Sequence, residues 1–187
     1  MTTDLTSNAN AEDQDFPDAE IIYTEQQIAA ALDQLAISLN DTMAGTNPVV
    51  LCVMNGGLIF TGHLLTRINF QCELDYIHAT RYANSTTGNT LEWLSYPKST
   101  LKGRTVLILD DILDEGITLE AIEKYCYAQG ALNVEKAVLL HKHHDRCCIE
   151  INRGHVALNV DDKYVFGFGM DYEGKFRYLN AIYSLRG

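Results

Sequence analysis

A segment that joins an apolar run to a helical pattern through acidic residues places the strongest constraint on this fold. The apolar residues 106–109 precede two aspartates, two further apolar residues follow, and residues 114–116 lead to Thr118, where helical spacing begins. We interpret the segment as a buried strand, a short acidic loop and a helix N-terminus. Ligands of open α/β sheets bind at such junctions. The carboxylates suit ribose hydroxyls and Mg²⁺, and the free N–H groups suit a phosphate.

Strands and helices are expected to alternate along the rest of the chain. Helical spacing covers residues 25–43 after a capping-box pattern that begins at Thr24. Apolar runs of strand length, each suited to burial on both faces, occupy residues 49–54 and 137–140. Further strand candidates are residues 71–79 and 91–97. We therefore expect an α/β fold, with a mainly parallel doubly wound sheet flanked by helices.

Two segments stand outside this alternation. Residues 1–18 are rich in Thr, Asn, Asp, Glu and Gln, so we expect a mobile acidic tail, followed by a single domain over residues 19–187. Residues 82–90 are polar and mostly small, and long loops of this kind in compact domains are often lids. We expect residues 82–95 to close over a site and to exclude water.

Composition excludes several classes of protein. The net charge of −11 argues against sequence-independent binding of nucleic acid, which needs clustered Lys and Arg. No apolar run approaches the roughly 20 residues of a membrane span. The five cysteines are odd in number, and the first twenty residues carry no apolar stretch typical of a signal peptide. We therefore expect a cytoplasmic protein with reduced thiols and no membrane partner.

The polar residues near the predicted strand ends have open interpretations. Asp110 and Asp111 suit a diol and a hard cation, but they could equally form a solvated acidic loop. Asp114 could exchange a proton with a substrate, although local sequence favours a helix N-cap. Lys142 could be an ordinary lysine at a strand end. The nearby His and Cys residues match no structural zinc spacing, and a strand end followed by a turn explains them better: His141, His143, His144, Cys147 and Cys148.

Four separated motifs resemble those of type I phosphoribosyltransferases, and in particular the hypoxanthine-guanine phosphoribosyltransferases. They occur in the expected order, and the resemblance covers roughly residues 20–185. The motifs are residues 53–57, 109–118, 140–142 and 162–171, and residues 172–177 continue the last pattern. The resemblance implies that family's fold, with a small hood built from the N- and C-terminal segments.

The resemblance also implies an activity in purine salvage. A 6-oxopurine, hypoxanthine or guanine or both, attacks the anomeric carbon of phosphoribosyl pyrophosphate (PRPP) and gives IMP or GMP and pyrophosphate, with Mg²⁺ as cofactor. Related enzymes are usually homodimers or homotetramers. Two other interpretations remain: a regulatory protein of the same fold that binds PRPP or a nucleotide, and a phospho-acceptor receiver domain, which also uses aspartates at strand ends.

The resemblance assigns roles around the acidic segment. Asp110 and Asp111 would hold the ribose hydroxyls and, through them, Mg²⁺. Asp114 would be the catalytic group that exchanges a proton with N7 of the purine. The 5′-phosphate would lie against the main-chain N–H groups of the residues that follow and against the Thr118 hydroxyl: Glu115, Gly116, Ile117 and Thr118.

The remaining motifs supply the other parts of the expected site. The pyrophosphate loop would consist of Asn55, Gly56 and Gly57, with Arg177 in support and a non-proline cis peptide bond before Asn55. Lys142 would donate to O6 of the purine, Tyr164 would stack on the ring, and the Val165 backbone would contact the base edge. Asp171 would contact Mg²⁺ through water. Arg81 and Tyr82 would begin the lid loop.

The chain departs from the family pattern at several positions. Relatives often carry Thr or Ser where this chain has Glu115, sometimes Lys where it has Ile117, and often Lys where it has Asn55. Arg81 replaces the serine of a Ser-Tyr pair. A carboxylate beside a phosphate costs energy unless it points away, so we infer that phosphate binding here rests on main-chain dipoles.

Overall fold

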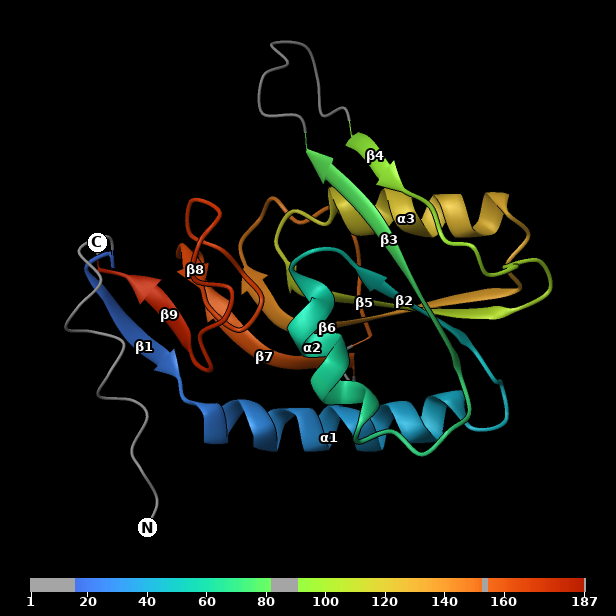
Figure 1. The fold of residues 1–187 in the computed structure, drawn as a ribbon, viewed down its shortest axis with the longest axis horizontal. Coiled ribbons are helices and arrows are strands. Elements are labelled where there is room, and N and C mark those ends of the chain that lie inside the picture. Colours follow the sequence, from blue (N-terminus) through green and yellow to red (C-terminus); the bar gives the residue numbers. More distant parts are fainter. Residues whose placement is uncertain (1–15, 82–90, 153–154, 187) are drawn as a thin grey trace.

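The computed structural model describes residues 16–81, 91–152 and 155–186, and within them six strands form the central sheet (Figure 1). Neighbouring strands run parallel except for the pair β3 and β4 at one edge, which is antiparallel. The strands, in sheet order, are β4 Leu91–Ser95, β3 Glu73–Arg81, β2 Val49–Val53, β5 Thr105–Leu113, β6 Asn133–His143 and β7 Val156–Asp161. The predicted mainly parallel sheet is therefore confirmed.

Helices cover both faces of the sheet, as the prediction of a doubly wound fold requires. Figure 1 shows α1 (Glu25–Met43) and α2 (Gly57–Leu65) on one side and α3 (Ile117–Ala128) on the other. Helix α1 begins with the predicted capping box, in which the Thr24 hydroxyl accepts from the Gln27 backbone and the Gln27 side chain accepts from the Thr24 N–H.

The central strands are buried on both sides because their apolar side chains alternate between two cores. Along β5, Leu107 and Leu109 belong to the core beneath α1 and α2. Val106 and Ile108 belong to the core beneath α3. Successive side chains of a strand point to opposite faces, so the continuous apolar run serves both layers at once.

A small antiparallel sheet joins the two ends of the chain beside the main sheet. Within the described residues it contains β1 Ala19–Tyr23, β9 Ile182–Leu185 and β8 Val165–Phe166, in that order. Its core is aromatic, and Phe16 packs edge-on against Phe166, Phe176 and Tyr183. The hood expected from the N- and C-terminal segments is therefore confirmed. Residues 1–15 of the expected tail lie outside the described residues.

The acidic pair that follows the central apolar run lies in a strand, and the prediction of an acidic loop there was wrong. Strand β5 continues to Leu113, with Asp110 paired to Val138 and Leu113 paired to His141 of β6. Because β6 extends to His143, it offers backbone pairing partners to the residues of β5 that follow the apolar run 106–109. The turn comes only at residues 114–116, so the aspartates are fixed by the sheet.

Strands β3 and β4 form one edge of the sheet and lie on either side of the segment expected to begin the lid. Strand β3 ends at Arg81, which pairs with Leu91 of β4. Tyr82 and the rest of residues 82–90 lie outside the described residues, and the remainder of the lid expected over residues 82–95 forms β4. Among the helices that the structure describes, none has the length and apolar character needed to cross a membrane.

Candidate active site

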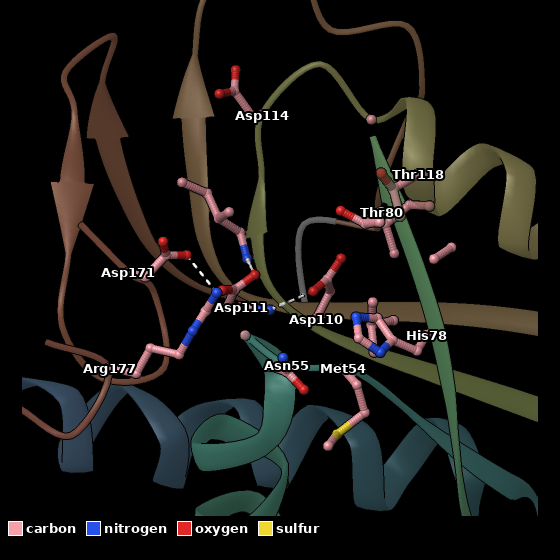
Figure 2. A pocket seen from close by; sticks show the side chains of 16 residues that line it. Met54, Asn55, His78, Thr80, Asp110, Asp111, Asp114, Thr118, Asp171 and Arg177 are labelled. Carbon is pink, nitrogen blue, oxygen red and sulfur yellow. Dashed lines mark hydrogen bonds and ion pairs between the residues drawn. The ribbon is translucent and has the colours of Figure 1, made fainter. Parts of the chain in front are cut away.

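A polar cleft of about 440 Å³ opens at the carboxyl ends of the central strands. Figure 2 shows Asp171 and Arg177 on one side of it and His78 and Thr80 of β3 on the other, with Asp110 and Asp111 between them. The described residues that line it are Val53–Gly56, His78–Thr80, Asp110–Ile112, Asp114, Gly116, Thr118, Leu119, Asp171 and Arg177. Most of the residues predicted from sequence therefore meet in one place.

Asp110 and Asp111 form the floor of this cleft. Asp110 is only 8% exposed, and its Oδ1 accepts from the Asp111 N–H at 2.9 Å. Burial raises the pKa of both carboxyls, and that of Asp110 is raised well above its usual range because Asp111 adds a second negative charge. Arg177 works in the opposite direction on the pKa of Asp111. Adjacent carboxylates, one buried and one half-buried, are hard oxygen donors that fit a divalent cation.

Asp171 and Arg177 reach the cleft from the hood as an ion pair. Arg177 Nη2 lies 2.5 Å from Asp171 Oδ1, and the Gly174 N–H donates to Asp171 Oδ2 at 2.8 Å. Both oxygens of Asp171 are therefore engaged within the protein. The carboxylates of Asp110 and Asp111 fit a cation directly, whereas Asp171 fits one only through water or after Arg177 has moved.

Asp114 does not cap helix α3. Residue Gly116, in the left-handed region at φ +83°, occupies the N-cap position, and no side chain caps the helix. The Asp114 carboxylate instead accepts from Lys142 Nζ at 2.8 Å and pairs with His144 Nε2 at 2.5 Å. Burial raises the pKa of Asp114, but the bonds from Lys142 and His144 outweigh it and hold the pKa below its ordinary value.

The pyrophosphate loop predicted from Asn55, Gly56 and Gly57 divides into two parts. Asn55 and Gly56 line the cleft, and the peptide bond between Met54 and Asn55 is cis, as the resemblance implies. Gly57 begins α2, where a side chain would meet the Leu109 carbonyl at 2.8 Å. Gly57 therefore allows close packing of α2 on β5, whereas the two residues before it face the cleft.

The segment predicted to hold the 5′-phosphate, residues 115–118, also divides into residues that line the cleft and residues that do not. Gly116 and Thr118 line the cleft, but Glu115 and Ile117 are not among the described lining residues. The Glu115 carboxylate lies 3.8 Å from Nε of Arg146, which also forms two bonds to Asp162 at 2.9 Å. Glu115, at which the chain departs from the family pattern, thus directs its negative charge toward the Arg146 guanidinium.

The residues predicted to bind a purine surround a second, smaller cavity of about 190 Å³. Lys142, Tyr164 and Val165 line it together with Ile112 and Met170. Tyr164 is 51% exposed and its hydroxyl donates to the Asp171 carbonyl at 3.2 Å, whereas Val165 is buried. Asp111, Ile112, Asp114 and Asp171 belong to both cavities, which therefore adjoin.

Sequence reasoning missed three residues at this site. His78 and Thr80 line the cleft from β3. The only sequence signal for them is their spacing of two residues near the end of a predicted strand, which places both side chains on the same face. His144 was assigned to a turn after a strand, yet its side chain is 4% exposed and contacts Asp114. No local pattern predicts that contact, because it joins residues on two different strand ends.

A family model for the phosphoribosyl transferase domain matches residues 18–173. The chain belongs to the phosphoribosyltransferase family. The hypoxanthine-guanine-xanthine phosphoribosyltransferase of Tritrichomonas foetus is 26% identical over 166 residues, which cover 89% of this chain and 91% of that protein. The hypoxanthine-guanine phosphoribosyltransferase of Bacillus subtilis is 27% identical over 168 residues, with 89% and 93% covered. This enzyme is thus similar to purine phosphoribosyltransferases along most of its length.

Solved structures agree with this assignment. A crystal structure of a hypoxanthine phosphoribosyltransferase from Staphylococcus aureus superimposes with a TM-score of 0.82 at 27% identity, and the match covers 90% of this chain and 92% of that one. The enzyme is therefore a phosphoribosyltransferase by sequence and by fold.

Proposed function

We propose that this enzyme transfers the 5-phosphoribosyl group from PRPP to a 6-oxopurine, hypoxanthine or guanine or both, in purine salvage. The observation that carries the proposal is the pair of adjoining cavities. The larger is polar and acidic and suits a ribose, its phosphate and pyrophosphate, whereas the smaller is lined by Lys142, Tyr164 and Val165 and suits a flat base. The names of the relatives point to the same substrates.

We also propose that the reaction depends on Mg²⁺ held by Asp110 and Asp111, with Asp171 contacting it through water. The chemistry of the donors supports this, because two adjacent carboxylates with raised pKa values, one buried and one half-buried, are costly to ionise without a nearby cation. Bound Mg²⁺ would neutralise negative charge that develops on the departing pyrophosphate. Asn55, Gly56 and Arg177 would bind the other side of that group.

The transfer step follows from the positions of these groups. The N9 lone pair of the purine forms a bond to C1′ of the ribose while the C1′–O bond breaks, and pyrophosphate leaves with that electron pair. The proton on N7 passes to the Asp114 carboxylate. Lys142 donates to O6 and so disfavours an amino group at that position, because two donors would face each other.

The test is a set of reactions that contain purified enzyme, PRPP, Mg²⁺ and one of hypoxanthine, guanine, xanthine or adenine, with nucleotide measured by chromatography. We expect turnover with a 6-oxopurine, none with adenine, and loss of activity without Mg²⁺ or in Asp114→Asn. Asp41→Asn, on the exposed face of α1, is the control and should retain activity. Absence of turnover with every 6-oxopurine, in enzyme that binds PRPP, would overturn the proposal and favour a regulatory role.

Three further parts of the proposal concern the protein as a whole. We propose that residues 19–187 act as one domain, that the enzyme is a homodimer or homotetramer, and that it works in the cytoplasm. An apolar groove beside α2 and β3, with Leu58, Leu74 and Tyr76 exposed, supports self-association. All five cysteines are free thiols, which supports a reducing compartment. Light scattering of wild type and Leu74→Glu tests the assembly, and a monomeric wild type would contradict it.

A further inference from the structure

We propose that His144 is a positioning residue for phosphoribosyl transfer: it holds one oxygen of the Asp114 carboxylate as a neutral donor, so that the other oxygen can take the purine proton when Lys142 moves to O6. The inference rests on the proposed function, because it assigns Asp114 to N7 and Lys142 to O6. What it adds is a group that controls the orientation of the catalytic carboxylate without itself contacting the substrate.

Both oxygens of the Asp114 carboxylate are occupied. Lys142 Nζ lies 2.8 Å from Oδ2, and His144 Nε2 lies 2.5 Å from Oδ1. A purine proton needs one of these oxygens, so one partner must leave before transfer. Lys142 is the partner with another acceptor to go to, because it lines the smaller cavity where the 6-oxo group would lie. His144 is not among the described residues that line that cavity, so the 6-oxo group offers it no alternative acceptor.

The backbone fixes which nitrogen of His144 carries the proton. The Arg146 N–H donates to His144 Nδ1 at 3.1 Å, so Nδ1 must present a lone pair. The proton of the neutral ring is then on Nε2, the nitrogen that faces Asp114 Oδ1. A second proton on Nδ1 would cost the hydrogen bond from Arg146. The tight turn after β6 therefore keeps the ring as an Nε2–H donor.

The two partners of Asp114 differ in mobility. The His144 side chain is 4% exposed and the Lys142 side chain 12% exposed, whereas the Asp114 side chain is 38% exposed. A buried ring held at both nitrogens stays in place, whereas a lysine pivots on a flexible stem. Once Lys142 has left, the bond from His144 prevents rotation of the Asp114 carboxylate and leaves Oδ2 aimed at the base.

Charged groups from several neighbouring segments act on this arrangement, among them Glu115, which lies 3.8 Å from Arg146 Nε. Lys142 comes from the end of β6, Arg146 from the turn that follows, and Asp162 from the residues after β7. Asp162 forms two bonds to Arg146 at 2.9 Å, and this pair holds the turn whose N–H contacts His144.

The test compares two substitutions at His144 with a control on the neighbouring histidine. His144→Phe keeps the ring shape and removes the donor, whereas His144→Gln places an amide N–H near the position of Nε2. His143→Phe is the control, because His143 is exposed and contacts Asn159 instead. We expect kcat to fall about tenfold or more in His144→Phe, to recover in His144→Gln, and to stay unchanged in the control. The KM for PRPP should not change in any of the three.

The pH profile separates positioning from a structural role. Loss of a hydrogen bond to the charged carboxylate raises the pKa of Asp114, so the acid limb of kcat/KM should move to higher pH in His144→Phe. His144→Gln should restore the wild-type limb. If folded His144→Phe keeps the wild-type kcat and acid limb, or if Gln is as damaging as Phe, the proposal is wrong.

A measurement without turnover distinguishes failure of this proposal from failure of the proposed function. Carbon-13 NMR of the aspartate carboxyls, assigned with Asp114→Asn, gives the titration of Asp114 in the free protein. We expect Asp114 to titrate at higher pH in His144→Phe than in wild type, whatever the substrate proves to be. Identical titrations in the two proteins would overturn the role of His144 even in an active enzyme.

Discussion

The carboxylate of Asp111 lies in the space that a side chain on Gly56 would need. A methyl group added to Gly56 would be 1.9 Å from Asp111 Oδ2. Gly169 of the hood lies on the other side of the same residue, where a methyl group would be 2.2 Å from the Gly56 carbonyl. Arg177 Nη1 in turn donates to the Gly169 carbonyl at 2.6 Å. The predicted pyrophosphate loop, the acidic strand and the hood therefore meet at one glycine.

This contact predicts a severe loss of activity in Gly56→Ala. The Asp111 carboxylate would have to move away from the cleft, and a displacement of about 1 Å at a reacting centre can cost about 100-fold in rate. We expect kcat/KM to fall by about that factor while the fold is retained. Steady-state kinetics with saturating purine and varied PRPP provide the measurement.

Gly62→Ala is the matched control for that variant. Gly62 lies in α2, and apart from the backbone of its own helix nothing lies within 4 Å of an added methyl group. Alanine is favoured over glycine in helices by about 1 kcal/mol, so we expect a slightly raised melting temperature and unchanged kinetics. Equal activity in the two variants would show that Asp111 tolerates the displacement.

The position of Glu115 leads to a second prediction. Its carboxylate lies 3.8 Å from Arg146 Nε, and Glu115 is not among the described residues that line the cleft, so we expect this carboxylate to make no contact with the 5′-phosphate. We expect Glu115→Thr to bind PRPP as tightly as wild type or more tightly, because a nearby negative charge is removed. Calorimetric titration with PRPP and Mg²⁺ measures the affinity. Thr118→Val, which removes a hydroxyl from the cleft, should weaken PRPP binding, and a large loss in Glu115→Thr would contradict the assignment.

The fold was predictable because its signals are local. Strand-length apolar runs separated by helical spacing indicated a parallel sheet, and the two cores on β5 follow from the same run. The extent of β5 was not predictable, because Asp110 and Asp111 join the strand only through pairing with β6. Polar residues can extend a strand when the neighbouring strand also extends and offers them backbone hydrogen bonds. A single sequence does not show which strand will be that neighbour.

The smaller cavity, in which we propose that the base binds, leads to a third prediction, on Tyr164. Its ring is half-exposed at the mouth of the cavity, where stacking on a purine would cover it. Base–aromatic stacking contributes about 1–3 kcal/mol, so Tyr164→Leu should raise the KM for the base about tenfold or more. Tyr164→Phe should keep the wild-type KM, because the stacking surface remains. Tyr178→Leu is the control, since Tyr178 is 71% exposed and lines neither cavity among their described residues.

The candidate site was predictable where motifs are contiguous, and less so where contacts cross the chain. Asp110, Asp111 and Gly56 belong to short motifs and meet in the cleft as expected. The pairing of Asp114 with His144 spans thirty positions and depends on the turn after β6. Local rules favoured an N-cap for Asp114, but Lys142 on β6 and His144 in the turn that follows offer a charged donor and a buried ring nitrogen instead.

A buried histidine outside the site leads to the last prediction, on stability and pH. His155 is fully buried, and its Nδ1 has no hydrogen-bond partner among the described residues, although Glu135 Oε2 lies 3.6 Å away. Burial lowers the pKa of His155, and Glu135 opposes this only in part. The unfolded chain binds the proton near the ordinary value of about 6.5, whereas the folded protein binds it only at lower pH. The unfolded state therefore binds more protons in that window, and acidification below about pH 6.5 favours unfolding.

The measurement is the free energy of unfolding in urea at several pH values between about 7.5 and 5, within the range where histidines titrate. Wild type should lose stability on acidification with a contribution from His155 of at most about 1.4 kcal/mol per pH unit. His155→Gln cannot titrate but keeps a polar group near Thr42 Oγ1, which lies 3.3 Å from His155 Nε2. The difference between wild type and His155→Gln should therefore shrink as the pH falls, with the urea dependence of both unchanged. A difference independent of pH would mean that His155 takes up its proton equally well in the folded and unfolded chains.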